Sequence, residues 1–564
     1  MAKYKPRQIR CLYVVVLLCA VAVICVCVGV FLHRGCSDGN FKHAAVAADS
    51  QRCSEIGRDI LQQGGSAVDG AIAALLCTGL VNPQSMGLGG GSIFTIMDES
   101  GKVKVFSSRE TVPLAFKADL LKDCPSSLQL ITGSQWIGVP GELRGYQEVH
   151  KRYGRLPWAS LFKPTIRLAR EGFPMPAFLS RFLSVPMITS AVKASPLCEV
   201  FCKENRTVLK TGDTLKFPKM AETMETVAQQ GADVFYTGSI GRDLIHDIKA
   251  SGGTLTMEDL RLFKVREEHA WTIPLGDYQM HIPPPPAGGA LLALILNIMK
   301  GFNLTPSSMD GEQKTQFYQR YIEASKFANG QRSSIRDPIF GTAGNIHLQN
   351  ASYLVSSDFA ARIRAKITQD GTHNDSYYNV TPSSDRYGTT HVSVLAEDGS
   401  AVSVTSTINH MFGSMVYSPR TGIILNNELA DFCGRADRFR SGEQPPSSMA
   451  PAILKSRSGD GTLVIGGSGG SMITTAMALS IMNHVWLGMG LKEAIAAPIV
   501  FVNGKNKVYK ESRFDKSVSE DLRRIGHRVE DCRFCFNVVN AVAKERGCIS
   551  AVSDARKMGQ AAGF

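Results

Sequence analysis

The sequence predicts an α/β protein that is preceded by one transmembrane helix. Two segments, Tyr387–Val394 and Val402–Asn409, flank an Asp398-Gly399 pair and carry apolar residues at alternate positions, which is typical of a β-hairpin. Residues 140–272 instead follow a mainly helical pattern. Residues 12–32 contain no charge and are long enough to span a bilayer as a helix.

The N-terminal segment sets the expected topology. Four basic residues (Lys3, Lys5, Arg7 and Arg10) precede the apolar span. The positive-inside rule then places residues 1–10 in the cytoplasm, 11–32 across the membrane and the remainder outside. A cleaved signal peptide would have a shorter apolar region and a small-residue cleavage site. We therefore expect a single-pass type II protein of the plasma membrane whose bulk is extracellular.

Composition supports a globular, exported chain. The 564 residues are 44% hydrophobic and 20% charged, which allows a large core. The net charge of +12 is spread without long basic runs beyond the first ten residues, so nucleic-acid binding is not expected. Outside the cell, some of the cysteines beyond the span should form disulfides. Five sequons precede Thr389 and predict surface glycosylation at Asn205, Asn303, Asn350, Asn374 and Asn379.

The first elements after the anchor are a strand and two helices. Ala44–Ala48 predicts a buried strand, and residues 54–63 and 67–80 predict helices, the second opened by a Ser66–Asp69 capping box. The glycine-rich segment 86–92 then leads into a strand at 93–96. It matches neither dinucleotide-binding nor P-loop patterns, so close backbone packing is its expected role.

The next elements deliver candidate binding residues. A strand at 103–108 ends at Arg109, which is either a surface charge or a bidentate clamp for a carboxylate. Pro283–Pro286 predicts a rigid turn into an apolar helix at 290–299. The polar segment 369–388 predicts an exposed, mobile loop before the hairpin. After the hairpin, a strand from Gly422 ends in two amides and two carboxylates.

The hairpin itself concentrates hydroxyl groups. If Asp398 and Gly399 form a two-residue turn, Thr389 lies opposite position 408, with Thr407 and Asn409 beside it. Because Thr is a good strand former, the segment could be only a half-buried strand. A Thr hydroxyl becomes a useful nucleophile if the chain is cut before Thr389. The new α-amine, with a reference pKa of roughly 7.7–8.0, then supplies the base.

A second glycine-rich turn offers an alternative. Residues 466–470 match G-x-S-x-G between a strand at 463–465 and a helix at 472–486, which could make Ser468 a hydrolase nucleophile. That enzyme needs a later acid and His, and the only His after His484 is His527, in a basic setting. The same turn can form an oxyanion hole from backbone N–H groups without Ser468.

Several motifs in order resemble the signature of the γ-glutamyltransferases, or glutathione hydrolases, which are N-terminal nucleophile hydrolases. These motifs are Thr389–His391, Thr405–Asn409, Asn426–Glu428, Pro446–Met449 and Gly469-Gly470. The resemblance covers the chain from Ala44 to Asp554. It implies an αββα sandwich that cleaves itself between Gly388 and Thr389 by an N-to-O acyl shift. The heavy subunit, 33–388, would keep the anchor and every sequon, and the light, catalytic subunit would be 389–564.

The resemblance also implies residue roles. Thr389 would be the nucleophile, hydrogen-bonded by Thr407, and Gly469 and Gly470 would form the oxyanion hole. The γ-glutamyl group would be bound by Arg109, Ser447 and Ser448 at its carboxylate and by Asn409, Glu428 and Asp431 around its amino group. Disulfides Cys53–Cys77 and Cys198–Cys202 are implied, whereas pairing of Cys36, Cys124, Cys433, Cys532, Cys535 and Cys548 stays open. No metal or organic cofactor is implied.

The implied reaction has two steps. Thr389 takes the γ-glutamyl group from glutathione or a glutathione S-conjugate as an ester, and water, an amino acid or a dipeptide then accepts it. His410-Met411 stands where some relatives place a Tyr, and the loop 433–446 is short. Both departures fit an enzyme for conjugates such as leukotriene C4, which would become leukotriene D4. The non-enzyme alternative is an uncleaved type II glycoprotein that serves as a receptor or adhesion module.

Overall fold

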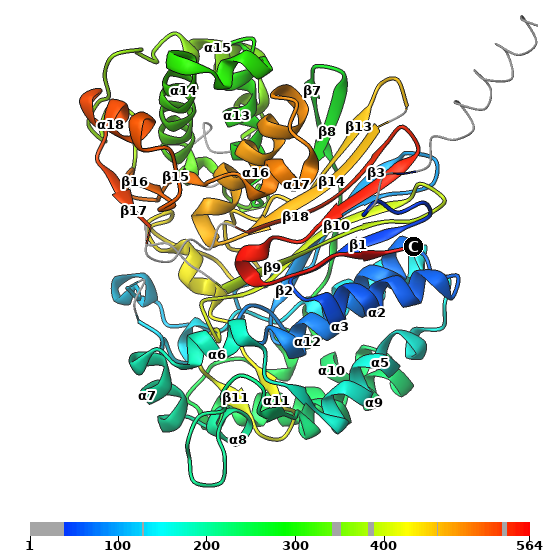
Figure 1. Ribbon diagram of the computed structural model, residues 1–564. Helices are drawn as coiled ribbons and strands as arrows, with labels where there is room; N and C mark the ends of the chain where they lie inside the picture. The colour runs from blue at the N-terminus through cyan, green and yellow to red at the C-terminus, as the bar shows by residue number, and fades with distance from the viewer. Residues whose placement is uncertain are drawn as a thin grey trace, which may run out of the picture.

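Two antiparallel β-sheets lie face to face between two layers of helices in the computed structural model, as the resemblance implies (Figure 1). The structure describes residues 36, 39–126, 129–340, 351–381, 388–459, 461–532 and 538–564. The first sheet has the order β20 (Ala562–Gly563), β1 (Ala45–Ala47), β9 (Gly388–Leu395), β10 (Ala401–Asn409), β2 (Gly91–Met97), β3 (Val103–Ser107) and β6 (Arg266–His269). The second has the order β19 (Cys548–Val552), β18 (Val538–Glu545), β14 (Gly461–Ser468), β13 (Ala452–Ser456), β8 (Tyr278–Ile282) and β7 (Trp271–Leu275).

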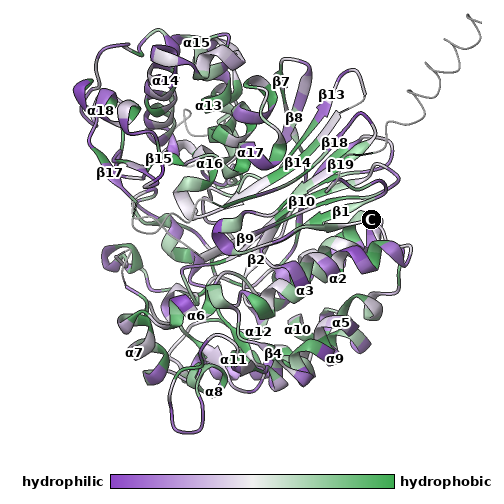
Figure 2. Cartoon of the chain, in the orientation of Figure 1, coloured by the Kyte–Doolittle hydropathy of each residue, from purple (hydrophilic) through white to green (hydrophobic). Residues whose placement is uncertain are grey.

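The helices pack on the outer faces of the two sheets. The first sheet is covered by α2 (Gln51–Gln62), α3 (Ala67–Val81), α4 (Glu142–Tyr153), α5 (Trp158–Glu171), α9 (Pro218–Gln230), α11 (Ser239–Ala250) and shorter helices between them. The second is covered by α13 (Gly289–Lys300), α14 (Gly311–Asn329), α15 (Ser357–Arg364), α16 (Ile473–Ile481), α17 (Leu491–Ala496) and α18 (Lys516–Arg524). In Figure 2, β10 and β14 mix hydrophobic with nearly neutral residues, whereas the outlying α18 is largely hydrophilic.

Side-chain alternation along β9 and β10 divides the core. Val392, Val394, Val402 and Val404 belong to the apolar cluster under α2 and α3. The opposite faces of these strands meet the second sheet through small residues, and Ser403 Oγ donates to Ile465 O at 2.9 Å across the gap. The residues of β9 with odd numbers, including Thr389, therefore lie between the sheets.

The predicted hairpin is present, but its register differs by one residue from the prediction. Ala401 pairs with Leu395, and the residue directly opposite Thr389 is Thr407, whereas the prediction placed position 408 there. The loop has three residues, because Ala396 N donates to Ser400 O at 2.9 Å. Gly399, at φ +84°, is the loop residue in the left-handed region. A primed two-residue turn would instead need a positive φ at its first central residue, which would be Asp398.

Other predicted elements agree with the structure. The Ser66–Asp69 capping box is confirmed, with Asp69 N donating to Ser66 Oγ at 3.1 Å. The polyproline run leads into α13. Gly90 packs so closely on β10 that a Cβ would lie 2.1 Å from Thr407 O, which confirms a backbone-packing role for the first glycine-rich segment. The predicted exposed loop at 369–388 is confirmed only in part: among its described residues Asn374 and Asn379 are exposed, whereas Tyr378 is buried and donates to Glu323.

Four disulfides with both partners described link the chain: Cys53–Cys77, Cys198–Cys202, Cys36–Cys548 and Cys124–Cys433. Asn205 and Asn303 are exposed as well, and Asn350 lies outside the described residues. Among the helices that the structure describes, none has the length and apolar character needed to cross a membrane. The predicted anchor at 11–32 lies outside the described residues.

Candidate active site

Thr389 stands at the start of β9 and is 5% exposed. Its Oγ1 lies 3.3 Å from Thr407 Oγ1 on the neighbouring strand. Thr390 points to the other face, where its hydroxyl donates to Asp49 Oδ2 at 2.5 Å. The alternation of the strand therefore separates two hydroxyls that the hairpin pattern alone could not distinguish.

The Thr407 hydroxyl links Thr389 to the preceding carbonyl. It donates to Gly388 O and accepts from Asn409 N at 2.8 Å. Since a hydroxyl has one hydrogen, the Thr389 hydroxyl is the donor in the pair of threonines. The result is a directional chain from Thr389 O–H through Thr407 O–H to the Gly388 carbonyl.

Arg109 forms the charged floor of the site. It is fully buried, and its guanidinium pairs with Glu428 Oε1 at 2.7 Å and Asp431 Oδ2 at 2.6 Å. Its Nε donates to Pro445 O at 2.9 Å. Of the two readings that the sequence left open for Arg109, the surface charge is wrong. A neighbouring carboxylate that sequence reasoning missed, Glu110, lies 3.9 Å from the guanidinium.

The carboxyl groups around Arg109 are not ordinary acids. Burial raises the pKa of Glu428 to about 7, against the opposing effect of the Arg109 charge and with a further raising effect from Asp431. Burial also raises the pKa of Glu110 well above its usual range, and the Glu428 charge adds to this. The raised pKa values show that burial disfavours negative charge on both carboxyl groups.

Two turns complete the site. Ser448 Oγ accepts from Arg332 at 2.8 Å, and the same guanidinium donates to Ser471 O at 2.8 Å. Gly469, at φ +118°, and Gly470, at φ +63°, adopt conformations that side chains rarely adopt, just before α16. This places their N–H groups at the beginning of a helical segment, where an anion is favoured.

One pocket brings the predicted residues together. Its lining includes Thr389 and every predicted catalytic or substrate-binding residue except Gly469, which precedes the lining residue Gly470. Sequence reasoning missed Arg435, Met449, Ser471 and Ile473, which also line it. Each of these lies within four residues of a predicted site residue, so the motifs gave a local signal but no reason to choose them.

The hydrogen bonds of Ser468 do not include the general base that a serine nucleophile needs. Its Oγ accepts from Lys557 Nζ at 2.8 Å and is buried. His527 is instead bonded to Gln319 and, at 3.1 Å, to Lys326 on α14. Its pKa is lowered to about 3 by burial and by the Lys326 charge. The later His that a Ser468 hydrolase requires is therefore committed elsewhere.

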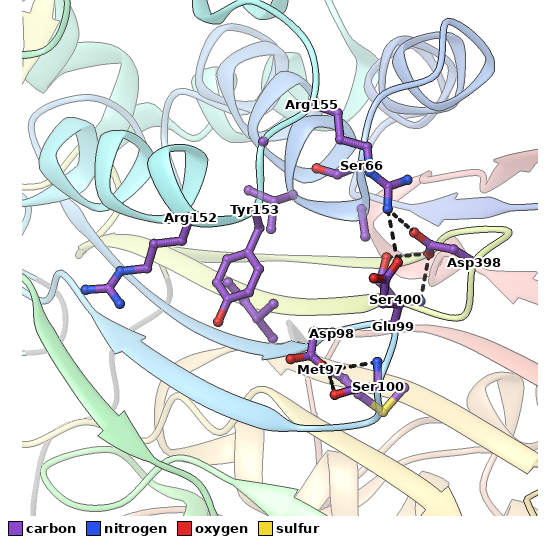
Figure 3. A pocket seen from close by; sticks show the side chains of 14 residues that line it. Ser66, Met97, Asp98, Glu99, Ser100, Arg152, Tyr153, Arg155, Asp398 and Ser400 are labelled. Atoms are coloured by element: carbon purple, nitrogen blue, oxygen red, sulfur yellow. Dashed lines mark hydrogen bonds and ion pairs between the residues drawn. The ribbon is translucent and has the colours of Figure 1, made fainter.

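A larger cavity, of about 520 Å³, lies at the opposite end of the hairpin (Figure 3). Arg155 pairs there with Asp398 at 2.5 Å, and Arg152 pairs with Glu267 at 2.8 Å. Asp98 accepts from Ser100 N at 2.9 Å. These charges satisfy one another, and the three serine hydroxyls of the lining bond to residues of their own turn or helix cap: Ser66 Oγ accepts from Asp69 N, Ser100 donates to Asp98 and Ser400 donates to Asp398. The smaller pocket at Thr389 is therefore the candidate active site.

Comparison with known proteins identifies the family. Residues 53–564 match the family model described as γ-glutamyltranspeptidase. The chain is 50% identical to glutathione hydrolase 5 proenzyme of Mus musculus over 545 residues, and 48% identical to that of Homo sapiens over 556 residues, covering 94% of each chain in both cases. The fold is similar to cephalosporin acylase from Bacillus halodurans, with a TM-score of 0.82 and 24% identity over 93% of this chain and 96% of the other. The chain belongs to the γ-glutamyltranspeptidase family and is an enzyme of the γ-glutamyltransferase and glutathione hydrolase type.

Proposed function

We propose that this enzyme cleaves the γ-glutamyl amide of glutathione and its S-conjugates, leukotriene C4 among them, through an ester on Thr389. Water, an amino acid or a dipeptide then accepts the γ-glutamyl group. The observation that carries the proposal is the position of Thr389, which lines one pocket with a buried Arg109 and two carboxylates paired to it. An amino acid bears one carboxylate and one ammonium, so it can exchange partners with this cluster without leaving a charge unpaired.

The proposal includes self-cleavage between Gly388 and Thr389. The Thr389 oxygen attacks the Gly388 carbonyl carbon, and its proton passes to Thr407 as Thr407 gives its own to the developing oxyanion. The directional hydrogen-bond chain through Thr407 supports this step. The C–N bond then breaks as the proton on the hydroxyl of the tetrahedral intermediate moves to the nitrogen and the C=O bond of the ester forms. Water hydrolyses this ester to the Gly388 carboxylate and the free Thr389 hydroxyl. The cut leaves residues 1–388, which comprise the anchor and the heavy subunit 33–388, and residues 389–564, which are the light subunit.

The cleaved site supplies the base for turnover. The α-amine of Thr389 takes the proton of its own hydroxyl, and Oγ1 attacks the γ-glutamyl carbonyl carbon. The N–H groups of Gly469 and Gly470 stabilise the oxyanion. The γ-glutamyl C–N bond breaks, and the leaving amine takes the proton from the α-ammonium. Water, activated by the same amine, hydrolyses the ester.

One exposed apolar residue, Ile131, lies near the pocket. Asn409 Nδ2 donates to Asn427 O, and Asn427 Nδ2 donates to Thr132 Oγ1, each at 3.1 Å. Segment 130–132 is thus two hydrogen bonds from a pocket residue. Its Ile131 is 54% exposed, and we propose that this side chain contacts the S-substituent of leukotriene C4.

N-terminal sequencing of the light fragment tests the proposal. We expect a fragment that begins at Thr389, and Thr389→Ala should abolish both cleavage and turnover because it removes the nucleophile. Ser468→Ala should still cleave and turn over glutathione; loss of turnover there would favour the Ser468 hydrolase. A single intact polypeptide from active-site-intact protein would favour the receptor or adhesion alternative.

We further propose that the heavy subunit anchors the enzyme in the plasma membrane through residues 11–32, with the catalytic part outside. The exposed sequons Asn205, Asn303, Asn374 and Asn379 support an exported chain. Surface biotinylation of intact cells should label both subunits. Labelling only after permeabilisation would contradict this topology.

A further inference from the structure

Lys557 is a buried lysine beneath Thr389 that the mechanism above does not use. It lies between β19 and β20 and is 4% exposed. Its ammonium donates to Thr389 O at 2.6 Å, to Asp49 Oδ2 at 2.7 Å and to Ser468 Oγ at 2.8 Å. All three hydrogens of the ammonium therefore have acceptors, and one acceptor is the backbone of the nucleophile.

The topology of the first sheet explains why this lysine is needed. Strand β1 ends at Ala47, opposite Ser393 of β9. Carbonyls of alternate residues along a strand point to the same edge, so those of 391 and 389 continue beyond the end of β1. Asn540 Nδ2 donates to His391 O at 2.7 Å, and Lys557 donates to Thr389 O. Side chains thus replace the missing strand at the catalytic end of β9.

The positive charge of Lys557 also lies close to the future α-amine. With standard backbone dimensions, the nitrogen of Thr389 is within roughly 6 Å of an ammonium bonded to its own carbonyl oxygen. A positive charge at this range disfavours protonation of an amine. Asp49 binds the next residue, Thr390, so it offsets the effect only in part. Consistent with this, burial and then the Lys557 charge lower the pKa of His391 to about 3.

We propose that Lys557 is a positioning residue that fixes Thr389 by its carbonyl and, through its charge, keeps the freed α-amine of Thr389 neutral and proton-accepting at neutral pH. This inference rests on the proposed cleavage before Thr389. The other charged or titratable groups that surround the amine are Asp49 and neutral His391 on the sheet side, and Arg109, Glu428, Asp431 and Arg435 on the pocket side. Replacing Lys557 keeps all of these residues in the sequence, but it removes the ion-pair partner of Asp49 and one of the two causes that lower the pKa of His391.

Competitive labelling with acetic anhydride between pH 5 and pH 9 measures the amine directly. The light-chain N-terminal peptide of the processed enzyme is quantified by mass spectrometry at each pH. We expect the wild-type α-amine to titrate about one pH unit below the reference of roughly 7.7–8.0. In Lys557→Met the titration should move up by about that amount, and Lys557→Arg should keep most of the wild-type value because it keeps the charge.

Lys510→Met is the matched control. Lys510 is also a buried light-chain lysine with one carboxylate partner, Asp531 at 2.6 Å, and it contacts none of the pocket residues named above. Its replacement should leave the α-amine titration unchanged.

An unchanged titration in Lys557→Met would overturn the proposal. If that variant fails to fold or cleave, the wild-type value decides, and a titration at or above the reference overturns the proposal. Absence of a wild-type fragment beginning at Thr389 would instead overturn the cleavage step itself.

Discussion

Arg109 and Glu428 form a buried charge pair that a γ-glutamyl group has to replace if it binds in this pocket as we propose. The pair is buried at 2.7 Å, and burial holds the pKa of Glu428 at about 7, opposed by Arg109. Below that pH the carboxyl group becomes neutral and loses its attraction for a substrate ammonium. The Michaelis constant for glutathione should therefore rise as the pH falls from 8 to 6.

Glu428→Gln tests this assignment. The amide has no charge for the substrate ammonium, and a charge-assisted hydrogen bond contributes about 1.5–3 kcal/mol, so KM at pH 8 should rise about tenfold or more. The variant's KM should also vary little between pH 6 and pH 8, whereas kcat keeps its own acid limb from the Thr389 amine. Steady-state kinetics across this range make the measurement. A variant with the wild-type pH dependence of KM would assign the proton to another group.

Single residues differ in how much the sequence reveals about them. The motif around Thr389 named the correct region, because hydroxyls at a strand start are unusual, but only the register placed Thr389 opposite Thr407 and turned Thr390 away. Lys557 gave no signal at all. A lysine after an arginine is typical of a solvated surface, and its burial results from β20 pairing with β1 more than five hundred positions earlier in the chain.

At the scale of elements, the two ends of the β9–β10 hairpin differ in how much room they leave for a side chain in place of a glycine. Gly399 has nothing within 4 Å of an added Cβ, although its φ of +84° would strain one. At the other end, a Cβ on Gly90 would lie 2.1 Å from Thr407 O. The same substitution should therefore affect stability at one end and chemistry at the other.

Gly399→Ala should cost about 1 kcal/mol and lower Tm by no more than a few degrees, with cleavage intact. Gly90→Ala should push Thr407 away from Gly388 and slow cleavage by at least about tenfold, because the displaced Thr407 hydroxyl is no longer aligned with the Gly388 carbonyl. Calorimetry and the fraction of light chain on a reducing gel report the two effects. Equal cleavage in both variants would show that Thr407 tolerates displacement.

The elements themselves were largely predictable, and the exceptions have physical causes. Alternation of apolar residues identified both strands of the hairpin. Both strands are buried on both faces, and the alternation arises because one face packs valines under α2 and α3 whereas the other packs small polar residues against the second sheet. The turn was wrong by one residue because an Asp-Gly pair suits both a primed two-residue turn and a three-residue loop with glycine in the left-handed region. Ala396 closing on Ser400 decided between them, and no local pattern encodes that choice.

On the scale of the whole molecule, the segments before and after Thr389, which are the two subunits of the proposed cleavage, are interleaved. In the first sheet, β9 and β10 lie between β1 and β2 from the earlier segment, and in the second sheet β13 pairs with β8 from the earlier segment. The layered arrangement was expected from the family resemblance alone. Composition and periodicity indicated strands and helices but carried no information about which distant strands become neighbours.

Two disulfides among the cysteines whose pairing the sequence left open add covalent links between the interleaved segments. Cys36–Cys548 and Cys124–Cys433 each join a residue before Thr389 to one after it, over separations of 512 and 309 positions. Neither pairing follows from the sequence, because spacing does not identify partners at such distances. If cleavage occurs before Thr389, both bonds become links between subunits.

The processed enzyme should therefore run as one species on a denaturing gel without reductant and as two when reductant is added. Replacing Cys36 and Cys433 by Ser should release the light subunit without reductant, because it removes one partner from each link. The same double variant should still elute as one heterodimer under native conditions, since both sheets contain strands of each subunit. Cys53→Ser is the matched control, because its disulfide to Cys77 lies within the heavy subunit and its loss leaves the subunits linked. Separation of the wild-type subunits on a gel without reductant would contradict the two covalent links, and native dissociation of the double variant would contradict the interleaved sheets.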